Sequence, residues 1–185
     1  MTKPAFIQLI AAVLLLFPVA ASAQSRVERI GIVNSPKEFG ISLGLKQNDR
    51  GIYNSLSLTA DLEGILDATE NTPGIKLSYI HENILKSGTI RDDVGYRLYI
   101  GGGFSAGYVK DHGPSDRNHG AMLGMAAGAG VIFIFPGRID IAAGVAGEFG
   151  LHLRTDEQYG NLDLSWYENG VIKSLIPKIT LYYRF

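Results

Sequence analysis

The sequence has no cysteine among its 185 residues, which excludes disulfide bonds, thiolate metal sites and cysteine nucleophiles. It also lacks an excess of positive charge, since 17 Lys and Arg residues are balanced by 18 Asp and Glu residues. A nucleic-acid-binding protein is therefore not expected. Charged residues form only 19% of the chain, below the roughly 25% of ordinary soluble domains. Glycine is abundant instead, with 23 residues, and the 46% hydrophobic content argues against intrinsic disorder.

Residues 1–23 have the three parts of a secretory signal peptide. Lys3 supplies the positive start, an apolar run extends from Ile7 to Val19, and Ala21-Ser22-Ala23 matches the small-residue cleavage site. An N-terminal membrane anchor is the alternative, but the apolar run is short and the cleavage pattern follows it. The sequence therefore predicts an exported protein whose mature part, residues 24–185, is a single domain.

Apolar residues alternate with small or polar residues along most of the chain, which is the period of a β-strand. In residues 139–153 one face is wholly apolar, and Asp140, Glu148 and His152 lie on the other. The pattern predicts seven strands: Phe39–Leu45, Asn54–Leu62, Gly74–Ile80, Gly95–Val109, Gly120–Ile134, Ile139–Leu153 and Leu175–Phe185. A short first strand near Val27–Val33 is needed to close a barrel and gives an even total of eight.

The second face of these strands indicates a membrane barrel rather than a soluble sheet. A face exposed to water would carry many Lys and Glu residues, whereas this face is small, polar and rich in glycine. Such a face fits the interior of a narrow closed barrel whose apolar face looks outward at lipid. The predicted fold class is therefore all-β, an eight-stranded antiparallel transmembrane β-barrel. Its inward ionisable residues carry both signs and are expected to pair: Asp61, Lys76, Arg97, Asp140, Glu148, His152, Lys178 and Arg184.

Residues 120–137 allow a second interpretation, because they contain no charged residue. Gly120, Gly124 and Gly128 have the spacing at which membrane helices pack against each other. A single helix beside lipid-facing strands would leave sheet edges open in hydrocarbon, which costs several kcal/mol for each unsatisfied group. The strand interpretation is therefore preferred.

The turns give each strand a direction. Pro136-Gly137-Arg138 is a tight link, and outer-membrane barrels place short turns in the periplasm and longer loops outside. The strands that follow then place external loops at Asp111–His119 and Arg154–Leu175, and both mature ends in the periplasm. A long periplasmic link, Glu82–Asp93, fits this arrangement less well.

The chain stops at a strand whose apolar positions are Ile179, Leu181, Tyr183 and Phe185. This terminus resembles the assembly signal of Gram-negative outer-membrane barrels, and the whole pattern resembles small eight-stranded barrels of the OmpA/OmpX type. The segment 101–112 is similar to members found in Bacteroidota envelopes. The resemblance implies a place in the outer membrane and recognition of the last strand by the barrel-assembly machinery. It implies no activity.

The sequence predicts no catalytic, cofactor or metal site. Glu148 and His152 share one strand face but lie about 13 Å apart. Ser105 also faces inward, and eight-stranded lipid A deacylases and palmitoyltransferases use His and Ser near the external rim. No His-x-Ser pattern occurs here, and Gly101–Gly103 is not a phosphate loop, because no Gly-Lys-Ser/Thr follows. The possible metal ligands of one external loop are better explained as solvated residues: Asp111, His112, Asp116 and His119.

The expected function is a non-enzymatic outer-membrane barrel with a structural or surface-interaction role. Its lumen is expected to be filled by side chains, because eight strands leave just enough room for them. Its partners would be outer-membrane lipid, the assembly machinery through Phe185, and an unknown protein at the external loops. A lipid-modifying enzyme and a soluble periplasmic binding barrel are the alternatives.

Overall fold

A computed structural model describes residues 26–46, 53–62, 74–91, 93–110, 119–155, 162–167 and 176–185. Within these ranges the chain forms β-strands and no helix, and hence no helix that is long and apolar enough to cross a membrane. The strands are β1 (Arg26–Asn34), β2 (Glu38–Lys46), β3 (Tyr53–Asp61), β4 (Gly74–Arg91), β5 (Val94–Lys110), β6 (His119–Ile134), β7 (Ile139–Thr155), β8 (Leu162–Tyr167) and β9 (Ile176–Arg184). The strand interpretation of residues 120–134 is therefore confirmed.

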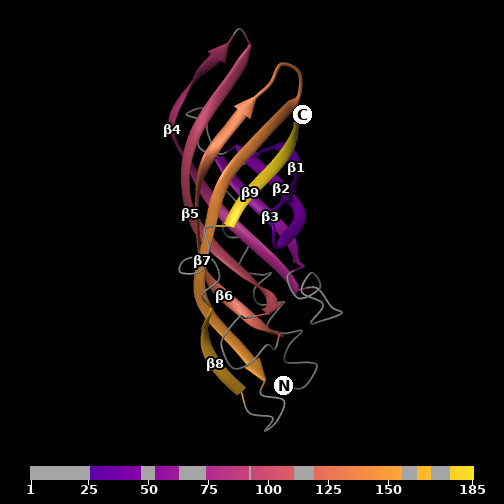
Figure 1. The fold of residues 1–185 in the computed structure, drawn as a ribbon, viewed down its shortest axis with the longest axis vertical. Coiled ribbons are helices and arrows are strands. Elements are labelled where there is room, and N and C mark those ends of the chain that lie inside the picture. Colours follow the sequence, from indigo (N-terminus) through magenta and orange to yellow (C-terminus); the bar gives the residue numbers. More distant parts are fainter. Residues whose placement is uncertain are drawn as a thin grey trace.

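The strands form a closed antiparallel ring with eight positions (Figure 1). Each strand from β1 to β7 pairs with the next one, and β9 closes the ring by pairing with both β7 and β1. β8 and β9 share one edge of β7, because β9 pairs with residues 139–146 and β8 with residues 150–155. The two strands thus fill one position. The predicted all-β fold, the eight-membered ring and the first strand are confirmed.

The ring closes with a stagger between its strands. When paired residues are followed from strand to strand, the row that begins at Ile176 in β9 runs through β7, β6, β5, β4, β3 and β2 and reaches β1 at Arg26. The direct pairing of β9 with β1 instead places Ile179 opposite Asn34. Such an offset is the shear of a barrel, and it requires the strands to tilt by roughly 35–45° from the barrel axis.

Two predicted connections are wrong. The link expected at residues 82–93 is strand, because β4 continues to Arg91 and pairs with β5 as far as Val94. Bulges at Leu85 and Ile90 each insert a residue and break the period of two, which hid the strand. The external loop expected at residues 154–175 contains β8. The tight β6–β7 turn is confirmed, and Gly137 adopts a positive φ of 91° there. Residues 1–23 and 111–118 lie outside the described residues.

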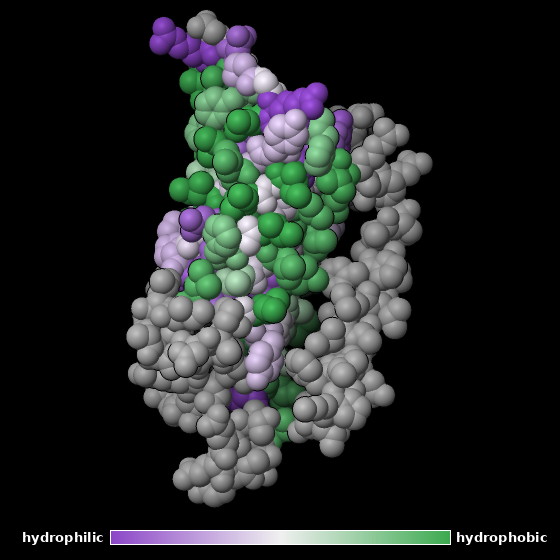
Figure 2. Space-filling view, turned by 90° about the vertical axis from the view of Figure 1, so that its right-hand side faces the viewer, coloured by the Kyte–Doolittle hydropathy of each residue, from purple (hydrophilic) through white to green (hydrophobic). Residues whose placement is uncertain are grey.

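The two faces of the wall differ as the alternation predicts. Outward side chains are apolar and exposed, as for Ile75 (60% exposed), Leu123 (60%) and Ile179 (58%). Inward ones are polar and buried, as for Lys76 (3% exposed) and His152 (0%). On the face seen in Figure 2, hydrophobic residues cover the middle of the wall, and hydrophilic ones gather at the upper end. The molecule therefore has its polar groups inside and its apolar groups outside.

Candidate functional site in the polar lumen

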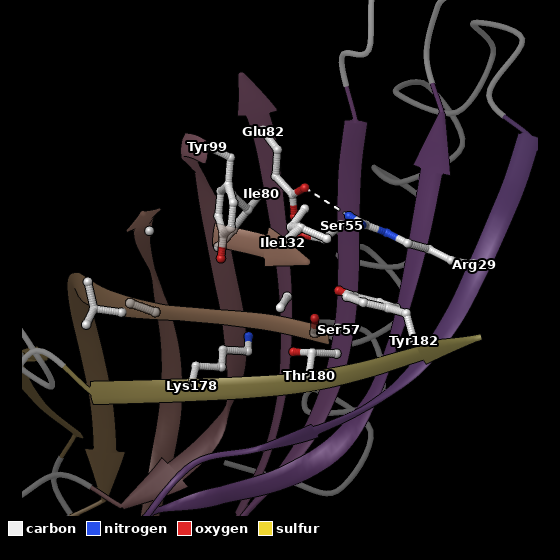
Figure 3. A pocket seen from close by; sticks show the side chains of 14 residues that line it. Arg29, Ser55, Ser57, Ile80, Glu82, Tyr99, Ile132, Lys178, Thr180 and Tyr182 are labelled. Carbon is white, nitrogen blue, oxygen red and sulfur yellow. Dashed lines mark hydrogen bonds and ion pairs between the residues drawn. The ribbon is translucent and has the colours of Figure 1, made fainter. Parts of the chain in front are cut away.

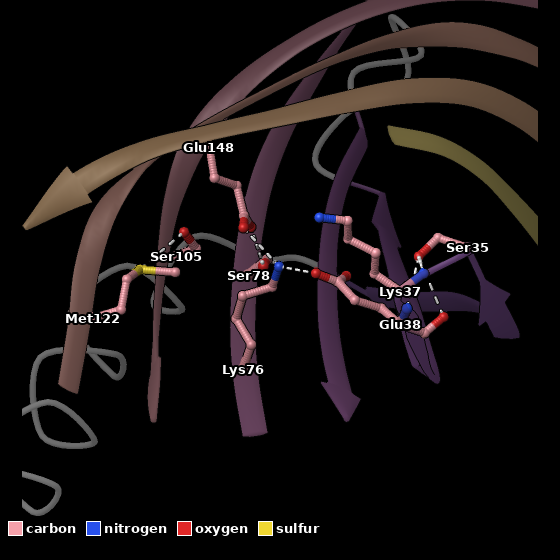
Figure 4. Close-up of polar contacts among 8 residues, drawn as sticks. All are labelled: Ser35, Lys37, Glu38, Lys76, Ser78, Ser105, Met122 and Glu148. Carbon is pink, nitrogen blue, oxygen red and sulfur yellow. Dashed lines mark hydrogen bonds and ion pairs between the residues drawn. The ribbon is translucent and has the colours of Figure 1, made fainter. Parts of the chain in front are cut away.

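An ion cluster around Lys76 joins three strands across the lumen (Figure 4). The Lys76 ammonium donates to the Glu38 carboxylate of β2 and, at 2.6 Å, to Glu148 Oε2 of β7. Ser78 Oγ donates to the other Glu148 oxygen at 3.3 Å. All four residues are buried. Since an unpaired buried charge is costly, loss of one member of this cluster would destabilise the contacts among β2, β4 and β7.

A second cluster is built on Arg29 of β1 (Figure 3). Arg29 Nη2 donates to Glu82 Oε2 of β4 at 3.0 Å. Its guanidinium lies over the rings of Tyr53, 5.2 Å from the centroid, and Tyr182, 4.3 Å from the centroid. The Tyr182 hydroxyl is hydrogen bonded to Ser42 Oγ at 3.0 Å. The large side chains of this cluster extend into the lumen, and the charges of Arg29 and Glu82 cancel within it.

Charged residues also line the end of the barrel where β9 finishes. Arg184 Nε lies 2.9 Å from Asp140 Oδ1, and Arg97 Nη1 donates to the Tyr53 hydroxyl at 2.7 Å. A cavity of about 210 Å³ opens among these side chains, with Lys46 also on its wall. This mouth is polar and wide enough for several water molecules.

The space deeper in the lumen is small. A cavity of about 30 Å³ lies between Arg29, Tyr99 and Lys178 (Figure 3). This volume accommodates one or two water molecules and no larger solute. Gly130 and Gly144 make room for Tyr99, because a Cβ at either position would lie within 2.9 Å of its hydroxyl. Side chains therefore fill the lumen, as the strand number predicts.

The three residues considered as catalytic candidates have separate partners. Glu148 belongs to the Lys76 cluster. His152 Nε2 lies 3.0 Å from the Val109 carbonyl oxygen, and its ring is 6.0 Å from that of Tyr167. Ser105 Oγ donates to the Met122 sulfur at 3.7 Å. Each candidate thus has a neighbour of its own: Lys76 for Glu148, the Val109 carbonyl for His152 and the Met122 sulfur for Ser105.

Among the residues considered as metal ligands, Asp111, His112 and Asp116 lie outside the described residues, and the side chain of His119 is likewise not described. Within the described ranges no group of three His, Asp or Glu side chains could hold a metal ion.

Sequence reasoning placed the pairing charges inside but missed three important members. Glu38 directly precedes the predicted strand at Phe39 and shares the face of Gly40, so the same alternation could have identified it. Glu82 fell in the predicted link, and Arg29 follows a bulge between Val27 and Arg29 that shifts the alternation in β1. The missed residues therefore lie where a strand boundary or a bulge interrupts the pattern.

Comparisons with known proteins reveal a likeness in fold. No family model matches the chain, and no curated protein matches it. The crystal structure of the N-terminal β-barrel domain of Pseudomonas aeruginosa OprF matches with a TM-score of 0.55 and 16% identity. The match covers 88% of this chain and all of that domain. The likeness supports the OmpA-type barrel fold expected from the sequence. An origin in Bacteroidota stays a prediction.

Proposed function

We propose that this chain is a non-enzymatic β-barrel of the Gram-negative outer membrane with a structural or surface-interaction role. The observation that carries the proposal is the reversed distribution of polarity, with apolar side chains outside and paired charges inside. Exposing one Leu, Ile or Phe side chain to water rather than burying it costs roughly 1.5–3 kcal/mol. Because the side chains of the outer wall are partly exposed, each incurs part of this cost around the ring in water, whereas lipid removes it.

A soluble periplasmic binding barrel is the weaker alternative. Such a barrel would turn its apolar face inward around a ligand, and small-molecule pockets usually measure about 300–1,000 Å³. Here the inner cavity measures about 30 Å³, and the Arg29–Glu82 ion pair lies on its wall. The outer wall, rather than the lumen, is the surface suited to apolar contacts.

A lipid-modifying enzyme requires a nucleophile, a base and an orienting group in mutual contact. Ser105, His152 and Glu148 are the candidates, and their contacts with Met122, Val109 and Lys76 favour a packed polar core. The proposed function therefore needs no cofactor and no reaction.

The proposed partners follow from the apolar outer wall and the polar lumen. Lipid acyl chains would cover the outer wall, and the external loops would carry any specificity for a protein partner. The last strand, which ends at Arg184 and is followed by Phe185, would be recognised by the barrel-assembly machinery during insertion. Phe185 is 70% exposed, so its ring is accessible for such recognition.

Cell fractionation combined with gel migration tests the proposal. We expect the mature protein in the outer-membrane fraction, with a migration in cold detergent that changes after boiling. A protein found only in the soluble periplasm would overturn the proposed location.

A further inference from the structure

The apolar outer wall is much taller on one side of the barrel than on the other. On β7 the outward positions from Ile139 to Leu153 are apolar or glycine without interruption. They span about 46 Å along the strand at roughly 3.3 Å per residue. On β2 the apolar outward positions run only from Phe39 to Leu45, which span about 20 Å. The difference lies at the end of the barrel where β7 finishes.

The shear of the barrel explains this difference. The row that begins at Phe39 in β2 passes through Ile75 and reaches Leu153 in β7. Because the strands tilt by about 40°, each step to the next strand raises such a row by roughly 3 Å along the barrel axis. The upper edge of the wall therefore climbs from β2 to β7. It drops at the seam with β1, where Asn34 pairs with Ile179, which itself pairs with Ala143.

The tall part of the wall carries large apolar side chains. Phe149 and Leu151 of β7 are 40% and 43% exposed, and the ring of Phe149 stacks on Trp166 of β8 at 5.2 Å. Leu164 of β8 is 62% exposed, and Leu123 of β6 is 60% exposed. The charges of this region face the other way, since Arg154 forms an ion pair with Asp163 at 2.7 Å. The outward surface is thus continuous with the lipid-facing wall below it.

We propose that lipid acyl chains cover this tall wall of β6, β7 and β8, because the barrel leans in the membrane toward that side. The inference rests on the proposed outer-membrane location. If the barrel stood upright with its short side centred in the bilayer, Leu151 and Leu164 would lie in water, because a hydrocarbon core is only about 30 Å thick. Leaning brings the centres of the tall and short sides to the same depth. We assign the covering of the tall wall to acyl chains, because this wall continues the apolar outer surface of the barrel and no outward charge interrupts it.

Spin labels on single cysteines test the proposal, and the absence of natural cysteine makes each label unique. Leu151→Cys and Leu164→Cys report on the tall wall, and Asp93→Cys, at the exposed β4–β5 turn, is the water control. Ile41→Cys reports on the belt of the short side, and Ile141→Cys reports on the belt of the tall side far from its upper edge. Cold-gel migration shows which labelled variants are folded, and Leu123→Cys is a second position on the tall wall.

The readout is the accessibility of each label to oxygen, which dissolves in lipid, relative to a water-soluble nickel complex. In vesicles of phosphatidylcholine we expect a ratio several-fold higher at Leu151 and Leu164 than at Asp93. If the labels at Ile41 and Ile141 lie in lipid while those at Leu151 and Leu164 lie in water, the leaning barrel is contradicted. The proposed membrane location is not. Strong spin–spin broadening at Leu164 would overturn it in favour of a second copy on this wall. Water accessibility at Ile41 and Ile141 would instead overturn the proposed membrane location.

Discussion

At the scale of single residues, buried charges determine how the barrel is held together. Lys76 forms ion pairs with two carboxylates from different strands, and Arg29 forms one ion pair and contacts two aromatic rings. A buried ion pair contributes little net stability over a well-packed apolar replacement, but removing one partner is strongly destabilising. The lumen is therefore sensitive to single substitutions and tolerant of balanced ones.

Replacing Lys76 with Met should lower the free energy of unfolding by about 3–5 kcal/mol, because Glu38 and Glu148 lose their shared cation. Urea unfolding of the vesicle-inserted protein, followed by the fluorescence of the single Trp, measures this loss. Lys86→Met is the matched control, since Lys86 is exposed in the same strand, and a change within about 0.5 kcal/mol is expected. Equal effects of the two substitutions would contradict a special role of Lys76.

Replacing His152 with Ala should leave the lipids of the membrane unchanged. The Val109 carbonyl would lose its hydrogen-bond donor, so stability should fall by about 1–3 kcal/mol. Mass spectrometry of lipid A from cells with the intact gene, the His152→Ala gene or no gene decides the question. A missing or added acyl chain that depends on His152 would show that the protein is a lipid-modifying enzyme.

At the scale of strands, the alternation of residue types predicted the main elements because each strand separates an apolar outer face from a polar lumen. The alternation failed to predict a strand where bulges shift it or where the strand is short and polar. In β4 the bulges at Leu85 and Ile90 shift the alternation, and in β8 the polar residues Asp163 and Ser165 resemble a loop. Asp163 in fact faces Arg154, while Trp166 faces outward. Short strands of this kind need tertiary partners that sequence periodicity alone does not reveal.

The same limit applies to the polar lumen. Alternation identified Lys76 and Glu148 as inward residues, but it could not show that they meet across the barrel. Which residues face each other depends on the shear, and the shear depends on register through every pair of strands. Sequence reasoning therefore predicted many of the residues that line the lumen, but not which of them contact each other.

The last strand gives a prediction at this scale. Deleting Phe185, or replacing it with Asp, should reduce the amount of folded protein in the membrane. The Phe185 ring is exposed and packs edge-on against Tyr183 at 5.9 Å, so it adds little to the core. The expected loss is therefore in assembly, and Phe185→Tyr should assemble normally as the control. Normal levels of heat-modifiable protein after the deletion would contradict an assembly signal.

At the scale of the whole molecule, the lumen is closed by its own side chains. The Arg29 cluster joins β1 to β4 across the lumen, and the cavity beside it holds one or two water molecules. The folded protein should therefore form no stable channel of large conductance in planar lipid bilayers. Recordings from protein whose folding is verified by cold-gel migration test this expectation, and stable large openings would contradict a filled lumen.

The most direct measurement of the membrane-barrel account is folding of the purified mature chain with and without a bilayer. Circular dichroism and cold-gel migration follow the same urea-diluted sample in phospholipid vesicles and in lipid-free buffer. Because the exposed wall is apolar all around the ring, we expect the compact heat-modifiable form in vesicles and aggregation in buffer. A stable, monomeric β-sheet protein in lipid-free buffer would contradict the account.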